Sequence, residues 1–520
     1  MESLQSKEYK KEFVTQFPGD DSGDVKPRQT PGVVFYSKAA PTPVKAPKLL
    51  AWSEELAQEL RIQKPATQAE IDILGGNLVT ETMYPYAACY AGHQFGNWAG
   101  QLGDGRAITL GEWPAPDGKT YELQLKGAGP TAYSRRADGR AVLRSSVREY
   151  LMSEAMHYLG IPTTRALSLV STGDQVMRDM FYNGNPEFEP GAIVMRVAPS
   201  FLRFGSFEMP AARQEIDNLR QLVDWTITNY YPHIQGEDRV IVWFREVVDR
   251  TAHLMVEWMR VGFVHGVMNT DNMSILGLTI DYGPFSFVDN YDTQFTPNTT
   301  DLPGRRYAFG QQPGIGQWNL GCLASALAPL FPNTEQLVAE LEAYETKFMQ
   351  KYRAMLGNKL GLDAVLEDDV HLLTQLETML ATLQPDMTIF YQLLMTLPEG
   401  EQDQAAVVSH FQESLYAELL PKERDMLHDF ITAYKARLAD NSISKEASQE
   451  RMQQANPRFI LRNYLLSQAI DDLTKGDDQL FNDLQEAIKE PYSNKHDRFF
   501  VKRPDWASHK PGSSMLSCSS

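Results

Sequence analysis

The chain has 520 residues, 42% of them hydrophobic and 22% charged, and its formal net charge at pH 7 is −18. This composition is ordinary for a globular enzyme, and the length allows a large core and about three domains. The acidic balance argues against sequence-independent binding of nucleic acid, which needs a basic face. No apolar run approaches the ~20 residues of a membrane span.

The N-terminus and the cysteines indicate a compartment. The first 13 residues contain Glu2, Glu8 and Glu12 and no apolar core, which argues against a signal or transit peptide. The cysteines Cys89, Cys322 and Cys518 have no metal-like spacing and favour a reducing compartment. We expect a cytoplasmic monomer with neither a membrane nor a nucleic-acid partner.

The first 126 residues predict an extended segment, two helices and a hairpin. Residues 1–50 are rich in Pro and Lys and predict a wrapping segment with one strand near 33–36. Ser53 is a good N-cap for a first helix, and a second helix over 68–74 ends at two glycines. Strands are expected over 107–113 and over 120–126, and in the second of these apolar and polar residues alternate.

A glycine-rich stretch, residues 90–106, precedes this hairpin. Its glycines are Gly92, Gly96, Gly100, Gly103 and Gly105. Such a loop can cradle phosphates with backbone N–H groups, while Lys126, near the end of the second strand, reaches over them. The alternative is two ordinary turns and a lysine that faces solvent.

Charged residues further along could complete an anion site. A helix over 145–159 carries Glu149, which could pair with Lys126 and orient its ammonium; otherwise Glu149 is a surface acid. A strand over 192–197 carries Arg196, and Arg203 follows it. These arginines could clamp anionic oxygens, although each taken singly would ordinarily be solvated.

The stretch 263–281 is the centre of the functional hypothesis. It contains Asp271, Asn272 and Asp281, separated by short apolar runs at 273–276 and 278–280. We expect a polar loop followed by a tight hairpin that places the second acid opposite the first. Oxygen ligands at both ends of a hairpin suit Mg²⁺ or Mn²⁺ on phosphates. The alternative is that Asp and Asn only cap turns.

Helical patterns dominate the rest of the chain. Helices are expected over 211–231, 238–261 and 317–330, then to about residue 486, with an irregular span at 289–316. We therefore divide the chain into an extended segment (1–50), a sheet-rich lobe (51–205), a helical lobe (206–490) and a tail (491–520). The tail is rich in Lys, Pro and Ser, and Cys518 near its end is expected to be exposed and mobile; the alternative is an inert tail residue.

These features stand in the order seen in protein kinases, but with departures. His265 and Asn272 have the spacing of the kinase catalytic loop, and Asp281 begins Asp-Tyr-Gly in place of Asp-Phe-Gly. The glycines do not follow G-x-G-x-x-G. Val267, which cannot accept a proton, occupies the position of the kinase base, and the nearest acid is Asp271.

Several long blocks together resemble the SelO (selenoprotein O, YdiU) family of protein adenylyltransferases. They are residues 92–106, 125–129, 145–149, 265–272 and 281–285, and the Ser-Cys-Ser-Ser ending. The resemblance implies an α+β, bilobal, kinase-like fold with a small β-rich N-lobe and a large helical C-lobe. It also implies a bacterial enzyme that binds ATP turned around relative to kinases and transfers AMP to protein hydroxyls.

The resemblance also implies roles for individual residues. Asp271 would be the proton acceptor, and Asn272 and Asp281 would hold Mg²⁺ or Mn²⁺. Residues implied to bind the nucleotide are Gly103, Gly105, Arg106, Lys126, Asp138, Gly139, Arg196, Arg203 and Asp281. Eukaryotic members carry selenocysteine where this chain has Cys518, which implies a redox role. The loop at 295–298 has no cysteine to pair with it.

Three functions follow as hypotheses. The leading one is a protein adenylyltransferase that uses ATP on Ser, Thr or Tyr hydroxyls, with UTP as a further donor because no residue visibly fixes the base. The second is a kinase that uses the γ-phosphate with the same parts. The third is a nucleotide-binding scaffold without catalysis.

Overall fold

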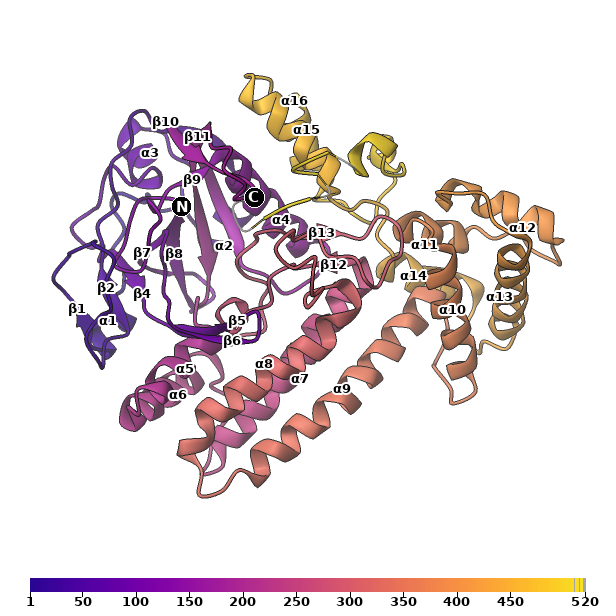
Figure 1. Cartoon of the computed structure of the whole chain (residues 1–520), viewed down its shortest axis with the longest axis horizontal. Helices are drawn as coiled ribbons and strands as arrows, with labels where there is room; N and C mark the ends of the chain where they lie inside the picture. The colour runs from indigo at the N-terminus through magenta and orange to yellow at the C-terminus, as the bar shows by residue number, and fades with distance from the viewer. Residues whose placement is uncertain (509, 514, 518–520) are drawn as a thin grey trace.

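The computed structural model describes residues 1–508, 510–513 and 515–517, so the predicted redox residue Cys518 lies outside the described residues. Strands gather in the N-terminal part of the chain, whereas helices dominate the C-terminal part (Figure 1). The predicted α+β class is therefore confirmed. In the part of the chain that the structure describes, no helix combines the length and apolarity needed to cross a membrane.

Within the described residues, the main sheet has nine strands in the order β1-β2-β4-β7-β8-β11-β10-β3, with β9 beside β11. Only β1 and β2 pair in parallel; the other pairs are antiparallel. The strands are β1 (Gly19–Asp20), β2 (Tyr36–Lys38), β3 (Lys48–Trp52), β4 (Tyr86–Ala88), β7 (Ala107–Pro114), β8 (Thr120–Lys126), β9 (Ala141–Val142), β10 (Arg165–Arg178) and β11 (Glu187–Ala198).

The predicted strands at 107–113 and 120–126 are confirmed as β7 and β8. Ala107 lies opposite Lys126 in their register.

Apolar side chains cover both faces of this sheet. On one face lie α2 (Glu54–Leu60) and α3 (Gln68–Leu74), which confirm the two early helices, and they share a core with Leu123 and Ile193. On the other face α4 (Leu143–Tyr158) packs across β10 and β11. The predicted helix over 145–159 is thereby confirmed.

A small hairpin interrupts the glycine-rich stretch. It consists of β5 (Ala91–Gln94) and β6 (Asn97–Gln101) and forms a separate two-stranded sheet. The expectation of a continuous loop over 90–106 is therefore wrong for its first half. Only 102–106, which contains Gly103 and Gly105, remains irregular next to β7.

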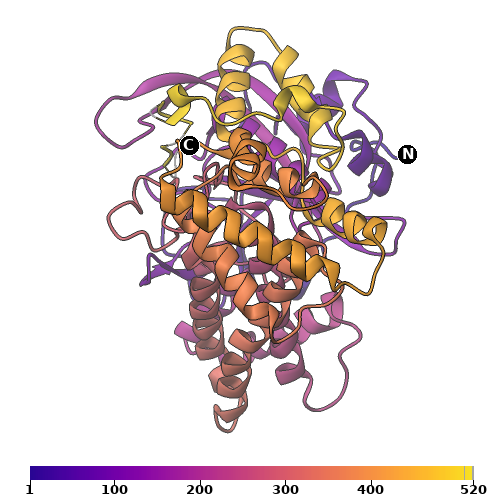
Figure 2. The same ribbon diagram turned by 90° about the vertical axis from the view of Figure 1, so that its right-hand side faces the viewer.

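The C-terminal part consists of packed helices. Their bounds are α5 (Phe204–Ala212), α6 (Ile216–Tyr230), α7 (Arg239–Val261), α8 (Gln312–Leu327), α9 (Glu335–Leu360), α10 (Asp369–Leu383), α11 (Met387–Met395), α12 (Gln404–Phe411), α13 (Pro421–Ala439), α14 (Lys445–Ala455), α15 (Asn463–Thr474) and α16 (Gln479–Ala487), with α1 (Glu12–Gln16) at the N-terminus. In Figure 2 the orange helices of residues ~370–455 face the viewer, and the yellow C-terminal segment lies above them.

The helix expected over 238–261 is confirmed as α7, but the one expected over 211–231 is two helices. The break comes between Ala212 and Ile216, where Gln214 has a φ of 59°. Pro210 lies near the end of α5 and cannot donate a helical hydrogen bond, which favours this break.

The stretch 263–281 does not form the expected hairpin. A 3₁₀ turn, Thr270–Asn272, is followed by two segments that pair with other parts of the chain. Ser274 forms a bridge with Arg203, and Thr279 forms one with Thr163. The apolar runs thus fill gaps between the sheet-rich and helical parts. The second acid is brought near the first by these outside partners.

Candidate active site

A cavity of about 710 Å³ lies where the sheet meets the loops that follow α7. It brings together residues from the glycine-rich stretch, from β8 and β11, and from the 267–284 loop. Most of the predicted site residues line it: Gly103, Gly105, Arg106, Lys126, Asp138, Gly139, Arg196, Asp271, Asn272 and Asp281. Of the others, Arg203 and Glu149 are buried and contact this lining through Asp281, Lys126 and Arg196, and Cys518 lies outside the described residues.

Lys126 is held by a carboxylate from α4. It is the last residue of β8, and Glu149 projects from the helix that crosses the sheet. Glu149 forms ion pairs with Lys126 and, at 3.1 Å, with Nη1 of Arg196. Burial lowers the pKa of Lys126, and Glu149 opposes that change. This pairing between strand and helix is the arrangement that orients the phosphate-binding lysine of protein kinases.

Asp281 lies between two guanidinium groups. Its Oδ1 is 2.5 Å from Nη1 of Arg196 and its Oδ2 is 2.5 Å from Nη1 of Arg203. Burial acts to raise its pKa, but Arg203, Arg196 and Lys126 outweigh burial and hold the pKa well below the ordinary value. Its φ of 56° is left-handed, which is uncommon for a residue other than glycine. Asp281 is therefore ionised and fixed in a strained backbone position.

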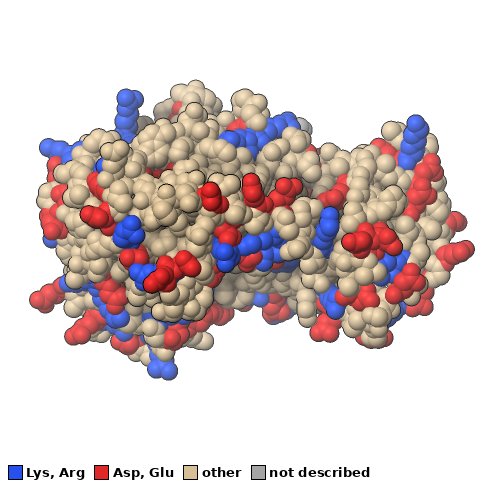
Figure 3. Space-filling model, turned by 90° about the horizontal axis from the view of Figure 1, so that it is seen from below, with Lys and Arg blue, Asp and Glu red and all other residues tan. Residues whose placement is uncertain are grey.

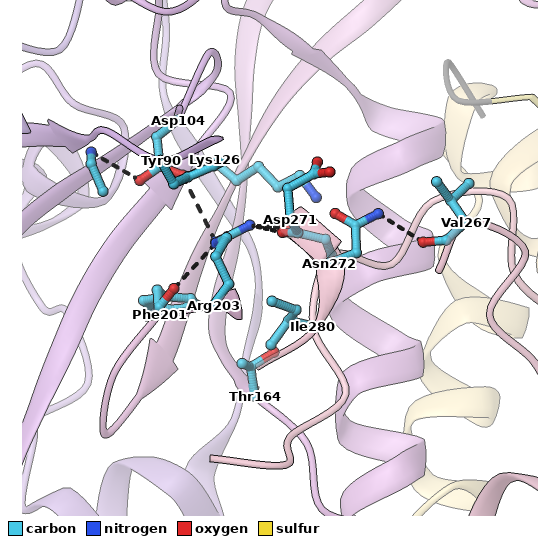
Figure 4. A network of polar contacts seen from close by, with 12 residues as sticks. Tyr90, Asp104, Lys126, Thr164, Phe201, Arg203, Val267, Asp271, Asn272 and Ile280 are labelled. Carbon is cyan, nitrogen blue, oxygen red and sulfur yellow. Dashed lines mark hydrogen bonds and ion pairs between the residues drawn. The ribbon is translucent and has the colours of Figure 1, made fainter. Parts of the chain in front are cut away.

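Arg203 contacts both acids, and its contacts with Asp271, Phe201 and Asp104 are drawn in Figure 4. Its Nη1 also donates to the main-chain oxygen of Asp271 at 2.8 Å, and its Nε donates to the oxygen of Phe201. The guanidinium lies 4.4 Å from the ring centre of Tyr90 and 3.9 Å from Asp104. One buried arginine thus fixes both the Asp271 turn and the Asp281 side chain.

Asp271 is a buried carboxylate with one uncompensated oxygen. Its Oδ2 accepts a hydrogen bond from Gln94 at 3.2 Å, whereas its buried Oδ1 has no hydrogen-bond donor. Burial raises its pKa to about 6, although Arg203 and the Gln94 hydrogen bond act in the opposite direction. A carboxylate with such a pKa is a suitable proton acceptor near neutral pH.

Asn272 turns its nitrogen away from the cavity. Nδ2 donates to the oxygen of Val267 at 2.8 Å (Figure 4), so the side-chain oxygen stays available to a ligand. Together with Asp281 it offers an amide and a carboxylate oxygen in one cavity. These are hard donors of the kind that Mg²⁺ and Mn²⁺ prefer, so the residues present fit such an ion.

His265 stabilises the loop that carries these acids through two hydrogen bonds to its main chain. Its Nε2 lies 2.8 Å from the oxygen of Ile280, to which it donates, and its Nδ1 accepts from the N–H of Val267. The ring stacks on Trp258, and burial lowers its pKa. His265 is therefore a neutral positioning residue, and it ties the start of the stretch to the residue before Asp281.

The outer part of the cavity is rich in arginine. Asp138 pairs with Arg178 at 2.7 Å. Arg106, Arg135 and Arg136 line the cavity without an ion pair to any residue that the structure describes. Elsewhere the surface is mixed: the face seen in Figure 3 shows Lys and Arg interspersed with Asp and Glu. Unpaired guanidinium groups around a cavity are suited to phosphate oxygens.

Two glycines are required for the shape of the cavity wall. A Cβ on Gly139, which has a φ of 69°, would lie 2.1 Å from the oxygen of Gly129. A Cβ on Gly103, with a φ of 134°, would lie 2.5 Å from the ring of Tyr133. Only glycine fits these positions without moving the backbone.

Sequence reasoning missed the buried polar layer under the site. Asp104 accepts hydrogen bonds from Tyr90 and Gln124, and Gln124 in turn accepts from Nε of Arg196 at 3.1 Å. Gln94, the partner of Asp271, was also missed. The available signals were an aspartate between two glycines, Gly103 and Gly105, and a glutamine on the same face of β8 as Lys126.

Comparisons with known proteins agree over nearly the whole chain. A family model described as protein adenylyltransferase SelO matches residues 25–489. A protein of Cytophaga hutchinsonii named protein nucleotidyltransferase YdiU is 61% identical over 520 residues, which cover 100% of both chains. Proteins with the same name are similar in Xanthomonas campestris pv. campestris, at 51% over 97% of this chain and 98% of that one, and in Rhodopirellula baltica, at 50% over 98% and 99%.

A search of solved structures matches ROP2 from Toxoplasma gondii, which is described as having a protein-kinase fold and no enzymatic activity. The identity is 12%, and the match covers 78% of this chain and 87% of that one. Its TM-score of 0.22 is too low to establish a common fold.

Proposed function

This chain belongs to the SelO family of protein adenylyltransferases, and on that basis we propose that it transfers AMP from ATP to Ser, Thr or Tyr hydroxyls of proteins. Pyrophosphate is the leaving group. The observation that carries the proposal is Asp271. It is a buried carboxylate with an uncompensated oxygen, beside the candidate metal ligand Asn272, whereas the position of a kinase base holds Val267.

Asp271 takes the proton of the attacking hydroxyl. A hydroxyl near neutral pH is a weak nucleophile, and a carboxylate within reach of its proton raises the rate of attack on the α-phosphorus. Gln94 holds one oxygen of Asp271 and leaves the other for this proton. Arg203 fixes the main chain of Asp271 and so sets its direction.

Cationic side chains stabilise the leaving pyrophosphate. Lys126, Arg196 and Arg106 line the cavity. Fixed positive charges aimed at developing negative charge are the largest source of stabilisation in such reactions. Asn272 and Asp281 would hold a Mg²⁺ or Mn²⁺ ion, which when bound supplies further charge to the phosphates.

UTP is a further donor under this proposal, because no residue that lines the cavity distinguishes one base from another by an evident contact. The protein works as a monomer on protein substrates. Transfer of the γ-phosphate is the second candidate, and the kinase-like pair of Lys126 and Glu149 is the observation that favours it.

Labelled nucleotides separate these functions. Incubation of the chain and a mixture of acceptor proteins with Mg²⁺ and α-labelled or γ-labelled ATP should leave label on protein only from the α position. Intact-mass analysis should show the addition of one nucleoside monophosphate per site. Asp271→Asn should abolish the transfer, and Asp117→Asn, the same change in the exposed turn between β7 and β8, should not. Retention of γ-label alone would show that the chain is a kinase.

A further inference from the structure

Three side chains of metal-binding type meet beside the catalytic turn. His93 comes from β5, Glu208 from α5 and Cys322 from α8, and one ligand atom from each lies within 4.8 Å of the others. The three positions are far apart in sequence, so no spacing pattern could reveal them. None of them lines the cavity described above.

Glu208 is the member of this cluster whose hydrogen bonding is incomplete. The residue is 2% exposed. Its Oε1 lies 2.5 Å from Nδ1 of His93, but its buried Oε2 makes no hydrogen bond of normal geometry. Burial raises the pKa of this carboxyl, and Thr270 and His93 offset that only partly. A buried carboxylate oxygen that lacks a hydrogen bond of good geometry is costly, and a cation is one of the groups that remove the cost.

We propose that His93, Glu208 and Cys322 bind a transition-metal ion of the Zn²⁺ type, with water as the fourth ligand. One imidazole, one carboxylate and one thiolate form a three-residue set of the kind that zinc accepts, and they exclude Mg²⁺, which avoids sulfur. Binding releases the Cys322 thiol proton to solvent. The thiolate and the carboxylate then balance the two charges of the ion.

The thiol is inert without the ion. Burial, and after it the charge of Glu208, raises the pKa of Cys322 to about 12, whereas Arg306 acts in the opposite direction. The guanidinium of Arg306 lies over Trp318, 4.6 Å from the ring centre. The rings of Trp98 and Trp318 pack against His93 with centroids 5.1 and 5.5 Å away.

The position of the cluster gives the ion a role. The N–H of His93 donates to Oγ1 of Thr270 at 2.7 Å, and the next residue, Gln94, donates to Asp271. A bound ion would therefore pin the β5–β6 hairpin to α5 and α8, and with it the donor that orients Asp271. This second step rests on the proposed function, but the binding of the metal does not.

Cobalt tests the binding directly. The full chain carrying Cys518→Ser, so that the terminal thiol cannot contribute, is titrated with Co²⁺ in the presence of excess Mg²⁺. One equivalent should bind and produce a thiolate-to-cobalt charge-transfer band. Cys322→Ser should remove the band, and His93→Gln should weaken binding at least ~10-fold. The matched control Cys89→Ser, at the other described cysteine, should keep it. No band in the parent protein, or a band that survives Cys322→Ser, would overturn the proposal.

Hydrogen exchange tests the pinning. Zn²⁺ should slow amide exchange in residues 91–101 of the Cys518→Ser protein and leave the Cys322→Ser, Cys518→Ser protein unchanged. Equal exchange with and without Zn²⁺ in the parent would refute the mechanical role. If the parent protein shows the cobalt band but neither it nor any variant transfers AMP, the proposed function is refuted and the metal site still stands.

Discussion

Replacing Asp271 by Asn should stabilise the protein while it abolishes transfer. The pKa of Asp271 is about 6 in the folded chain, against an ordinary value of 3.8. Because a raised carboxyl pKa means that the folded state binds the proton more tightly, folding loses stability as the pH rises from about 4 to about 6. The loss is complete above pH 6 and absent below pH 4.

The magnitude follows from that difference. One pKa unit corresponds to ~1.36 kcal/mol, so moving from 3.8 to about 6 costs about 3 kcal/mol. Asp271→Asn removes this cost because its side chain has no charge to bury. The variant should therefore be more stable than the parent by about 3 kcal/mol at pH 8, and the advantage should vanish near pH 4.

Urea unfolding of the metal-free chain at pH 8 and pH 4 measures this effect. Asp281→Asn is the matched comparison, since it makes the same chemical change ten residues away. Its expected effect on the free energy of unfolding has the opposite sign. The substitution removes the carboxylate that pairs with both Arg196 and Arg203 and should destabilise the chain at pH 8 by about 2–3 kcal/mol. This is less than for a fully buried pair because the Asp281 side chain is 21% exposed. If Asp271→Asn lowers stability at pH 8, the account of its burial is wrong.

Further changes test other parts of the site. Glu149→Gln should lower the free energy of unfolding by about 3–5 kcal/mol and weaken ATP binding, because Lys126 and Arg196 lose a buried partner. Calorimetry measures the stability and nucleotide titration the affinity. Unchanged ATP affinity would contradict the role of the pair. Gly139→Ala should lower the free energy of unfolding by about 1–3 kcal/mol more than Gly118→Ala, because Gly118 also has a positive φ but has open space around it. Equal melting temperatures of the two variants would contradict the steric argument. Chelation by EDTA should abolish AMP transfer, and Mg²⁺ or Mn²⁺ should restore it; transfer that survives chelation would exclude the metal role of Asn272.

Local sequence patterns predicted the helices and strands well where apolar residues recurred at a clear helical or strand spacing. The alternation over 120–126 gave β8 its bounds, and helical spacing placed Glu149 on α4. The same patterns could not decide whether Lys126 and Glu149 face each other or face solvent. That depends on how α4 crosses the sheet, which is a tertiary property.

The error at 273–280 has a similar cause. Two short apolar runs around Gly277 favour a hairpin if only local pairing is considered. In the structure Ile275 donates its N–H to Leu202, and Thr279 donates to Pro162, so distant segments outcompete the local partner. Gln94 and Asp104 were missed for the same reason, since single polar residues acquire meaning only from what the fold places opposite them.

The left-handed backbone of Asp281 limits which residues natural variation can place there. Asparagine and glycine adopt a φ of 56° at little cost, but a longer acid is disfavoured in that region. Glutamate, which substitution tables score as the mildest replacement, would pay a backbone penalty and move its carboxylate by one methylene. At this position, chemical similarity is therefore a poor guide to tolerance, because asparagine suits the backbone but loses the charge, whereas glutamate keeps the charge but strains the backbone.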